Sequence, residues 1–269
     1  MTFFNVLLAI CIGAFVGKFI AMVGYYLPKI LLEGCDKGKE PRDIFKWFFQ
    51  KPFCLQCKHP FAGCSGLPII GYYTLQGKCP NCTFSQRRGF ILELCVAAIF
   101  GTLTLFAGVN LPLIFVLLAL CLLMCCFLTD LDHMILPNQL TLALTWLGLI
   151  GSLFPVFLSP QEAIAGAVGG YGIFWLLNEI YRFFRHREGM YPGDFKLNAA
   201  IGACIGLKLL LPVLAISLML LFVITLVRVL GAKKPQTESV LYKEVAYGCY
   251  LSAVTMVTLV LLLFGVITP

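Results

Sequence analysis

Charged residues are scarce in this sequence. Only 12% of its 269 residues are Asp, Glu, Lys or Arg, whereas 60% are hydrophobic. A soluble domain of this size carries about twice that share of charge and could not bury so much apolar surface. The composition therefore excludes an ordinary soluble protein and predicts an all-α polytopic membrane protein.

Three signatures of other function classes are missing. The sequence has no Gly-rich strand-to-helix motif of the kind that binds nucleotides. Its net charge of +7 is not accompanied by a basic patch interleaved with aromatic residues. The charge is therefore only a weak argument for nucleic-acid binding. No internal repeat of the kind found in many membrane carriers is visible either. We therefore expect no nucleic-acid partner.

Long apolar segments fill most of the chain. A membrane-spanning helix needs about 20 mostly apolar residues. About eight such segments can be placed, at residues 2–24, 89–107, 111–129, 140–158, 161–181, 195–210, 211–231 and 245–267. The first has no basic leader and no evident cleavage site, so we expect a retained anchor instead of a signal peptide.

Basic residues are confined to a few connections between these segments. All but two of the 20 Lys and Arg residues lie in the connections 28–88, 182–196 and 228–244. The connections 108–112 and 157–163 carry none. Because Lys and Arg collect in cytoplasmic loops, we expect the three basic connections in the cytoplasm and both termini on the opposite side.

The first basic connection contains two pairs of cysteines, Cys54-Leu-Gln-Cys57 and Cys79-Pro-Asn-Cys82. Each pair can form a knuckle that offers two thiolates, and two knuckles complete a tetrahedral four-sulfur site. Such a site suits structural zinc, although iron is not excluded by the ligands. His59 is a competing ligand, and two disulfides or unrelated thiols are the alternatives. A cytoplasmic location disfavours disulfides.

Acidic residues are few enough to consider one by one, with 13 in all. Asp130 ends an apolar segment, and Asp194 follows Gly193 just before the next apolar segment, so both are expected at the cytoplasmic boundary. Two carboxyls at one depth can share a proton, as aspartyl hydrolases require. The ionised carboxyl then activates water and the protonated one donates to the scissile carbonyl.

Structural roles for these acids remain open. Asp194 is well placed to cap a helix N-terminus, and Asp130 could be a solvated acid at a helix end. Asp132 and His133 lie next to Asp130 in sequence, but a side chain two residues further along a helix points nearly the opposite way. Asp132 is therefore expected to face solvent.

Three stretches resemble the bacterial type IV prepilin leader peptidase family, whose members are bifunctional N-methyltransferases. They are the paired cysteines with Leu67-Pro68 and Leu75-Gln-Gly77-Lys78 between them, Thr129–Thr141, and Glu188–Leu197. The family's first aspartate precedes a Pro by seven residues, and its second closes a G-x-G-D motif. The resemblance thus selects Asp130 and Asp194 as the catalytic pair.

The resemblance also implies the substrate and the cofactors. Members cut the short basic leader of prepilins or secretion pseudopilins after a Gly, at the cytoplasmic face of the bacterial inner membrane. They then methylate the new amino terminus with S-adenosylmethionine, an activity linked to the cysteine loop and to Gly77. The implied domains are a first helix at 1–27, a zinc-binding loop at 28–88 and a seven-helix peptidase core at 89–269.

Some positions depart from the family pattern. Tyr191 replaces the first Gly of G-x-G-D and Pro192 follows it, Gly17-Lys18 begins a stretch without the family's polar Asn, and a late Pro-Phe-Gly-Pro element is echoed only in Ala246-Tyr247-Gly248-Cys249. Two alternatives therefore stay open. One is an ion-coupled carrier, in which the two aspartates bind protons or cations, and the other is a non-catalytic scaffold for pilin-like partners.

Overall fold

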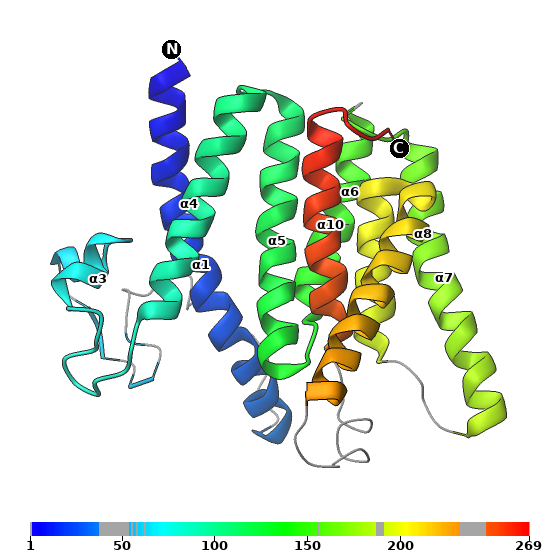
Figure 1. Cartoon of the computed structure of the whole chain (residues 1–269), viewed down its shortest axis with the longest axis horizontal. Helices are drawn as coiled ribbons and strands as arrows, with labels where there is room; N and C mark the ends of the chain where they lie inside the picture. The colour runs from blue at the N-terminus through cyan, green and yellow to red at the C-terminus, as the bar shows by residue number, and fades with distance from the viewer. Residues whose placement is uncertain are drawn as a thin grey trace. The chain divides into compact units, whose positions relative to one another are not determined.

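The computed structural model describes residues 2–37, 54, 56–57, 59–61, 63–154, 156–186, 191–231 and 246–268 (Figure 1). Throughout these ranges the regular structure is helical. An isolated antiparallel bridge joins Lys78 and Ser85, and no strand is formed within the described residues. The predicted all-α fold is therefore confirmed for the described part of the chain.

Five described helices are long and apolar enough to cross a membrane. They are α1 (Thr2–Lys37), α4 (Arg87–Ala107), α5 (Leu111–His133), α7 (Pro160–Arg185) and α8 (Pro192–Gly231). Two shorter helices accompany them, α6 (Asn138–Leu153) and α10 (Tyr247–Leu263). The protein is therefore a multi-pass membrane protein. Its helices form two compact units, Met1–Leu117 and Leu118–Pro269, here called unit 1 and unit 2.

In unit 1, α1 and α4 pack together through small residues. A Cβ atom at Gly13 would lie 2.8 Å from the Cα of Ala97, and one at Gly17 would lie 2.8 Å from the Cα of Glu93. Two glycines one helical turn apart thus let the backbones approach closely, as is common between helices in lipid. The helix continues to Lys37, well past the expected end of the first span at residue 24.

Unit 1 also contains the short helices η1 (Gly63–Gly66) and α3 (Ile70–Thr74). They occupy part of the connection that the sequence predicted as a loop, between the two cysteine pairs. Residues 38–53 of that connection lie outside the described residues.

In unit 2, α8 packs against α6, α7 and α10. Its first arm is densely buried, with Leu197, Ile201 and Ile205 fully enclosed. Gly166 of α7 and Gly202 of α8 face one another, and a Cβ on either would overlap the carbonyl oxygen of the other. The start of α8 is therefore held close to α7.

The helix α8 is interrupted at Gly206, where φ is 76° and ψ is 168°. Only glycine adopts these angles readily, so the chain can change direction here (Figure 1). The sequence predicted two spans in this region, 195–210 and 211–231. Two helical arms are present, but the break between them comes before residue 210.

Candidate active site and candidate metal centre

Asp130 lies in the last turns of α5 and is buried, with 4% of its surface exposed. Its Oδ2 atom accepts a hydrogen bond of 2.7 Å from the backbone N–H of Cys249 at the start of α10. A buried carboxyl must be paired to be tolerated, and this contact supplies the partner. The structure thus brings Asp130 to the N-terminus of a helix that follows much later in the sequence.

Asp194 lies in the first turn of α8 and is half-buried. Its backbone N–H donates to the carbonyl oxygen of Tyr191 at 3.0 Å, and its own carbonyl oxygen accepts from the Asn198 side chain at 2.9 Å. The partial positive charge at a helix N-terminus favours an acidic side chain at this position. Glu188, Gly189 and Met190, the first part of the family-like motif, lie outside the described residues.

The turn between α5 and α6 fills the space between the starts of α8 and α10. A Cβ at Gly193 would lie 3.1 Å from the Cβ of Leu136, and one at Gly248 would lie 3.0 Å from Leu136 Cδ1. Leu136 is therefore enclosed between two glycines, each next to the site. Met134 starts this turn with a positive φ of 54°.

The two carboxyls line one pocket of about 210 Å³. Its walls are formed by Asp130, Met134, Ile135, Leu136, Tyr191, Pro192, Gly193, Asp194, Ala246 and Tyr247. Asp130 is close enough to Asp194 for their charges to interact. Asp132 is exposed and does not belong to the wall. Two acidic groups beside mostly apolar walls form a site that can activate water next to an apolar polypeptide segment.

Sequence reasoning missed the third wall of this pocket. Ala246 and Tyr247 line it, and the N–H of Cys249 reaches Asp130. The available signal was the echo of the family's late Pro-Phe-Gly-Pro element at these positions. The sequence alone could not show that this element meets the aspartates.

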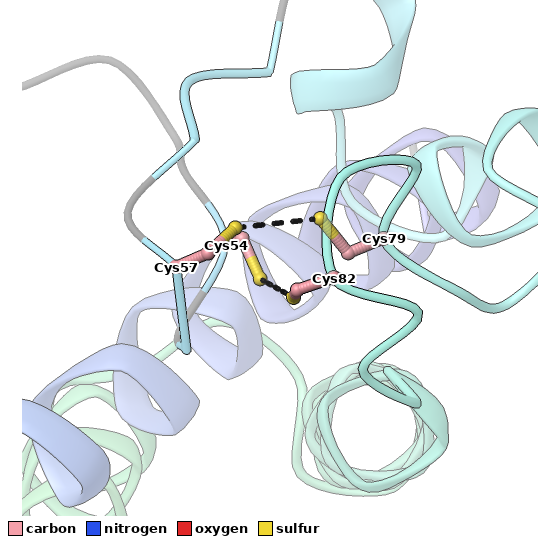
Figure 2. A group of neighbouring side chains, drawn as sticks. All are labelled: Cys54, Cys57, Cys79 and Cys82. Atoms are coloured by element: carbon pink, nitrogen blue, oxygen red, sulfur yellow. Dashed lines mark hydrogen bonds between the residues drawn. The ribbon is translucent and has the colours of Figure 1, made fainter.

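The four paired cysteines converge in unit 1, as Figure 2 shows. The four sulfur atoms lie within 4.8 Å of one another, and Cys54 and Cys79 are buried. The Tyr26 hydroxyl of α1 donates to the carbonyl oxygen of Cys54 at 3.0 Å and so ties the first pair to that helix. Phe61, Leu75 and Phe84 pack around the cluster.

The spacing of the sulfurs matches a tetrahedral metal site. Zinc–sulfur bonds of about 2.3 Å place the sulfurs of a regular tetrahedron about 3.8 Å apart. Here Cys54 and Cys82 are separated by 3.6 Å, and Cys57 and Cys79 by 3.7 Å. The cluster can therefore hold a metal ion with four protein ligands. His59 is exposed and is not part of it.

The environment of the thiols differs within the cluster. A hydrogen bond from the backbone N–H of His59 lowers the pKa of the Cys57 thiol to about 6, whereas burial raises the pKa of Cys54. Metal ligation needs thiolates, and of these two thiols Cys57 ionises more readily.

Gly77 lies between α3 and the second cysteine pair and has a positive φ of 71°. A Cβ here would lie 2.9 Å from the Tyr72 hydroxyl and ring. Tyr72 in turn stacks on Phe90 of α4, with ring centroids 4.1 Å apart. Both the backbone angle and the contact require glycine, and any larger residue would displace Tyr72.

Two charged residues inside membrane-spanning helices contact the segment that leads into α3. The Lys18 ammonium group donates to the carbonyl oxygen of Gly66 at 2.6 Å, and the buried Glu93 carboxyl accepts from the Ile69 N–H at 2.6 Å. Lys18 and Glu93 also interact electrostatically. Ionisable residues at membrane depth are costly and usually have a role. Here they fix the chain that leads into α3 and Gly77.

Comparisons with known proteins agree with one another. The profile described as Type IV leader peptidase family matches residues 115–226, and the one described as Bacterial Peptidase A24 N-terminal domain matches residues 11–107. The chain is 34% identical over 222 residues to a prepilin leader peptidase/N-methyltransferase of Neisseria gonorrhoeae, covering 78% of this chain and 77% of that protein. Identity to the protein of the same name from Pseudomonas aeruginosa is 33% over 221 residues, covering 76% and 74%. No solved structure matches the chain.

Proposed function

Because the chain belongs to the type IV leader peptidase family, we propose that it is a membrane aspartyl endopeptidase that removes the leader of type IV prepilins or pseudopilins. It then methylates the newly exposed amino terminus. The observation that carries the peptidase assignment is the presence of Asp130 and Asp194 in one pocket of unit 2. Two carboxyls in a partly apolar pocket are the groups that acid–base hydrolysis of a peptide needs.

The reaction uses one proton shared between the two carboxyls. The ionised carboxyl takes a proton from water while the water oxygen attacks the scissile carbonyl carbon, and the protonated carboxyl donates its proton to the carbonyl oxygen. The tetrahedral intermediate then collapses. The carbon–nitrogen bond breaks, the leaving nitrogen takes the proton removed from water, and a hydroxyl of the intermediate returns a proton to the second carboxyl.

The surroundings of the pocket fit a cut at the membrane boundary. Asp130 ends α5 and Asp194 begins α8, and the basic connections 182–196 and 228–244 adjoin the starts of α8 and α10. We assign this end of unit 2 to the cytoplasmic face of a bacterial inner membrane. Apolar walls such as Ile135 and Leu136 then face the apolar stem of the substrate next to its charged leader.

We assign zinc to the four-cysteine cluster, with Cys54, Cys57, Cys79 and Cys82 as ligands. With all four positions taken by protein, the ion would stabilise the fold of the loop and take no part in cleavage. S-adenosylmethionine supplies the methyl group in the second reaction. We link that reaction to the 28–88 connection and Gly77, and peptide cleavage to residues 89–269.

The decisive experiment compares wild type, Asp130→Asn and Asp194→Asn in detergent. Each protein is mixed with a prepilin-like peptide and S-adenosylmethionine, and mass spectrometry follows leader loss and methyl gain. Wild type should show both, whereas either Asn variant should lose cleavage, because Asn can neither hold the shared proton nor act as a base. Equal cleavage by an Asn variant would contradict the two-carboxyl mechanism, and a carrier or a scaffold would leave the peptide uncut.

A further inference from the structure

The first turn of α10 lies against Asp130. The first N–H groups of a helix have no acceptor within the helix and need an outside partner. Ala246, the residue before α10, has no side chain that can accept one. The Cys249 N–H donates instead to Asp130, which precedes it by 119 residues. Asp130 therefore caps α10, and α10 in return holds one oxygen of the carboxyl.

Gly248 makes this approach possible. A Cβ there would lie 3.1 Å from Asp130 Oδ2 and 3.2 Å from its Cγ. The backbone at Gly248 is helical, so its conformation would suit any residue. Glycine in a helix interior is less favourable than alanine. Glycine at this position therefore leaves space for the carboxyl.

We propose that the first turn of α10 is a positioning element of the carboxyl pair, in which Gly248 leaves the room that lets the Cys249 N–H hold Asp130 Oδ2. With Oδ2 held, the carboxyl keeps a fixed orientation in the pocket. This inference rests on the proposed peptidase function. It adds Gly248 as a positioning residue, which acts through Asp130.

Steady-state kinetics of Gly248→Ala with a prepilin-like peptide test the proposal. A carboxyl displaced by a few tenths of an ångström should lower kcat about tenfold. KM should change less than about twofold, because substrate contacts outside the carboxyl are retained. Gly172→Ala on α7 is the matched control, since a Cβ there meets nothing within 4 Å, and it should cut like wild type.

A second contact must be separated from the first. A Cβ at Gly248 would also lie 3.0 Å from Leu136 Cδ1. Comparing Leu136→Ala with the double variant Leu136→Ala/Gly248→Ala removes that contact from both proteins. If Asp130 is the affected group, the double variant should stay about tenfold below Leu136→Ala in kcat. Recovery to the level of Leu136→Ala would overturn the proposal.

A stability measurement covers the case in which the alanine variants are too unstable to assay. In the Leu136→Ala background, the change in melting temperature caused by Gly248→Ala should be less favourable when Asp130 is present than after Asp130→Ala, because only the first protein contains the crowded carboxyl. An equal change in both proteins would overturn the proposal. The proposed peptidase function and the proposed role of α10 can be distinguished by the results. If wild type does not cut the peptide, the peptidase function fails, whereas wild-type cleavage with an unimpaired Gly248→Ala defeats only the role of α10.

Discussion

Asp130 combines two roles that are usually separate. It is one member of the carboxyl pair, and it also caps α10 through the Cys249 N–H. We therefore expect a substitution at this position to change both chemistry and stability. The two effects can be separated, because an Asn side chain keeps an oxygen that accepts a hydrogen bond, whereas an Ala side chain does not.

We expect Asp130→Ala to be less stable than Asp130→Asn by about 1 kcal/mol, the usual value of a helix N-cap. Neither variant should cut a prepilin-like peptide. Unfolding in mixed detergent, followed by circular dichroism, gives the difference in stability. Equal stability of the two Asp130 variants would argue against the cap.

The two aspartates could be proposed from sequence because each adjoins an apolar segment and each matches a family motif. Gly248 and Cys249 could not, since their role depends on a contact between segments that lie far apart in the chain. Lys18 was visible as a departure from the family pattern. Its contact with the Gly66 carbonyl could not be predicted, because nothing in the local sequence places that carbonyl beside α1.

At the scale of helices, the sequence predicted where apolar segments lie better than where they end. The first span was expected to end at residue 24, but α1 continues to Lys37, since its later residues still permit helix. The boundary expected at residue 210 was also displaced. The break falls at Gly206, a position set by a backbone angle that hydropathy does not report.

The contacts made by Lys18 of α1 and Glu93 of α4 give a prediction at the same scale. Glu93→Leu should leave the Ile69 N–H without an acceptor and Lys18 without a nearby opposite charge, so the segment leading to α3 should loosen. We expect methylation of a pre-cleaved peptide to fall at least about tenfold, as a displaced site would require. Cleavage should change less than about twofold, because the carboxyl pair lies in unit 2.

Limited proteolysis of the segment 63–86 reports the loosening directly. Glu179→Leu is a suitable control, because Glu179 pairs with Arg182 on the surface of α7 and such pairs contribute little. Unchanged proteolysis and methylation in Glu93→Leu would show that the contacts of Glu93 are dispensable.

At the scale of the whole molecule, the two candidate sites lie in different compact units. The cysteine cluster belongs to unit 1 and the carboxyl pair to unit 2. The fold class and the membrane location could be predicted from composition, because a chain with 60% hydrophobic residues is compatible with few fold classes other than a bundle of membrane-spanning helices. The division into units could not, since hydropathy does not say which helices pack together.

This division predicts separate responses to loss of the metal. Cys57→Ser, or removal of the ion by a chelator, should reduce methylation strongly and leave cleavage within about twofold, because sites in different units are largely independent. Acidification should release the ion, since protons compete for the thiolates. Elemental analysis gives the metal content, and mass spectrometry gives both reactions. Cys95→Ser, at an exposed cysteine outside the cluster, is the control. Equal loss of cleavage would show that the units depend on one another.

The contact between Asp130 and α10 also sets an order of events during synthesis. Helix α5 is made and inserted long before α10, because 119 residues separate the two partners of the hydrogen bond. Until the last described helix enters the membrane, the carboxyl lacks its N–H partner and the pocket lacks one wall. We therefore expect the chain to gain peptidase activity only once α10 is in place.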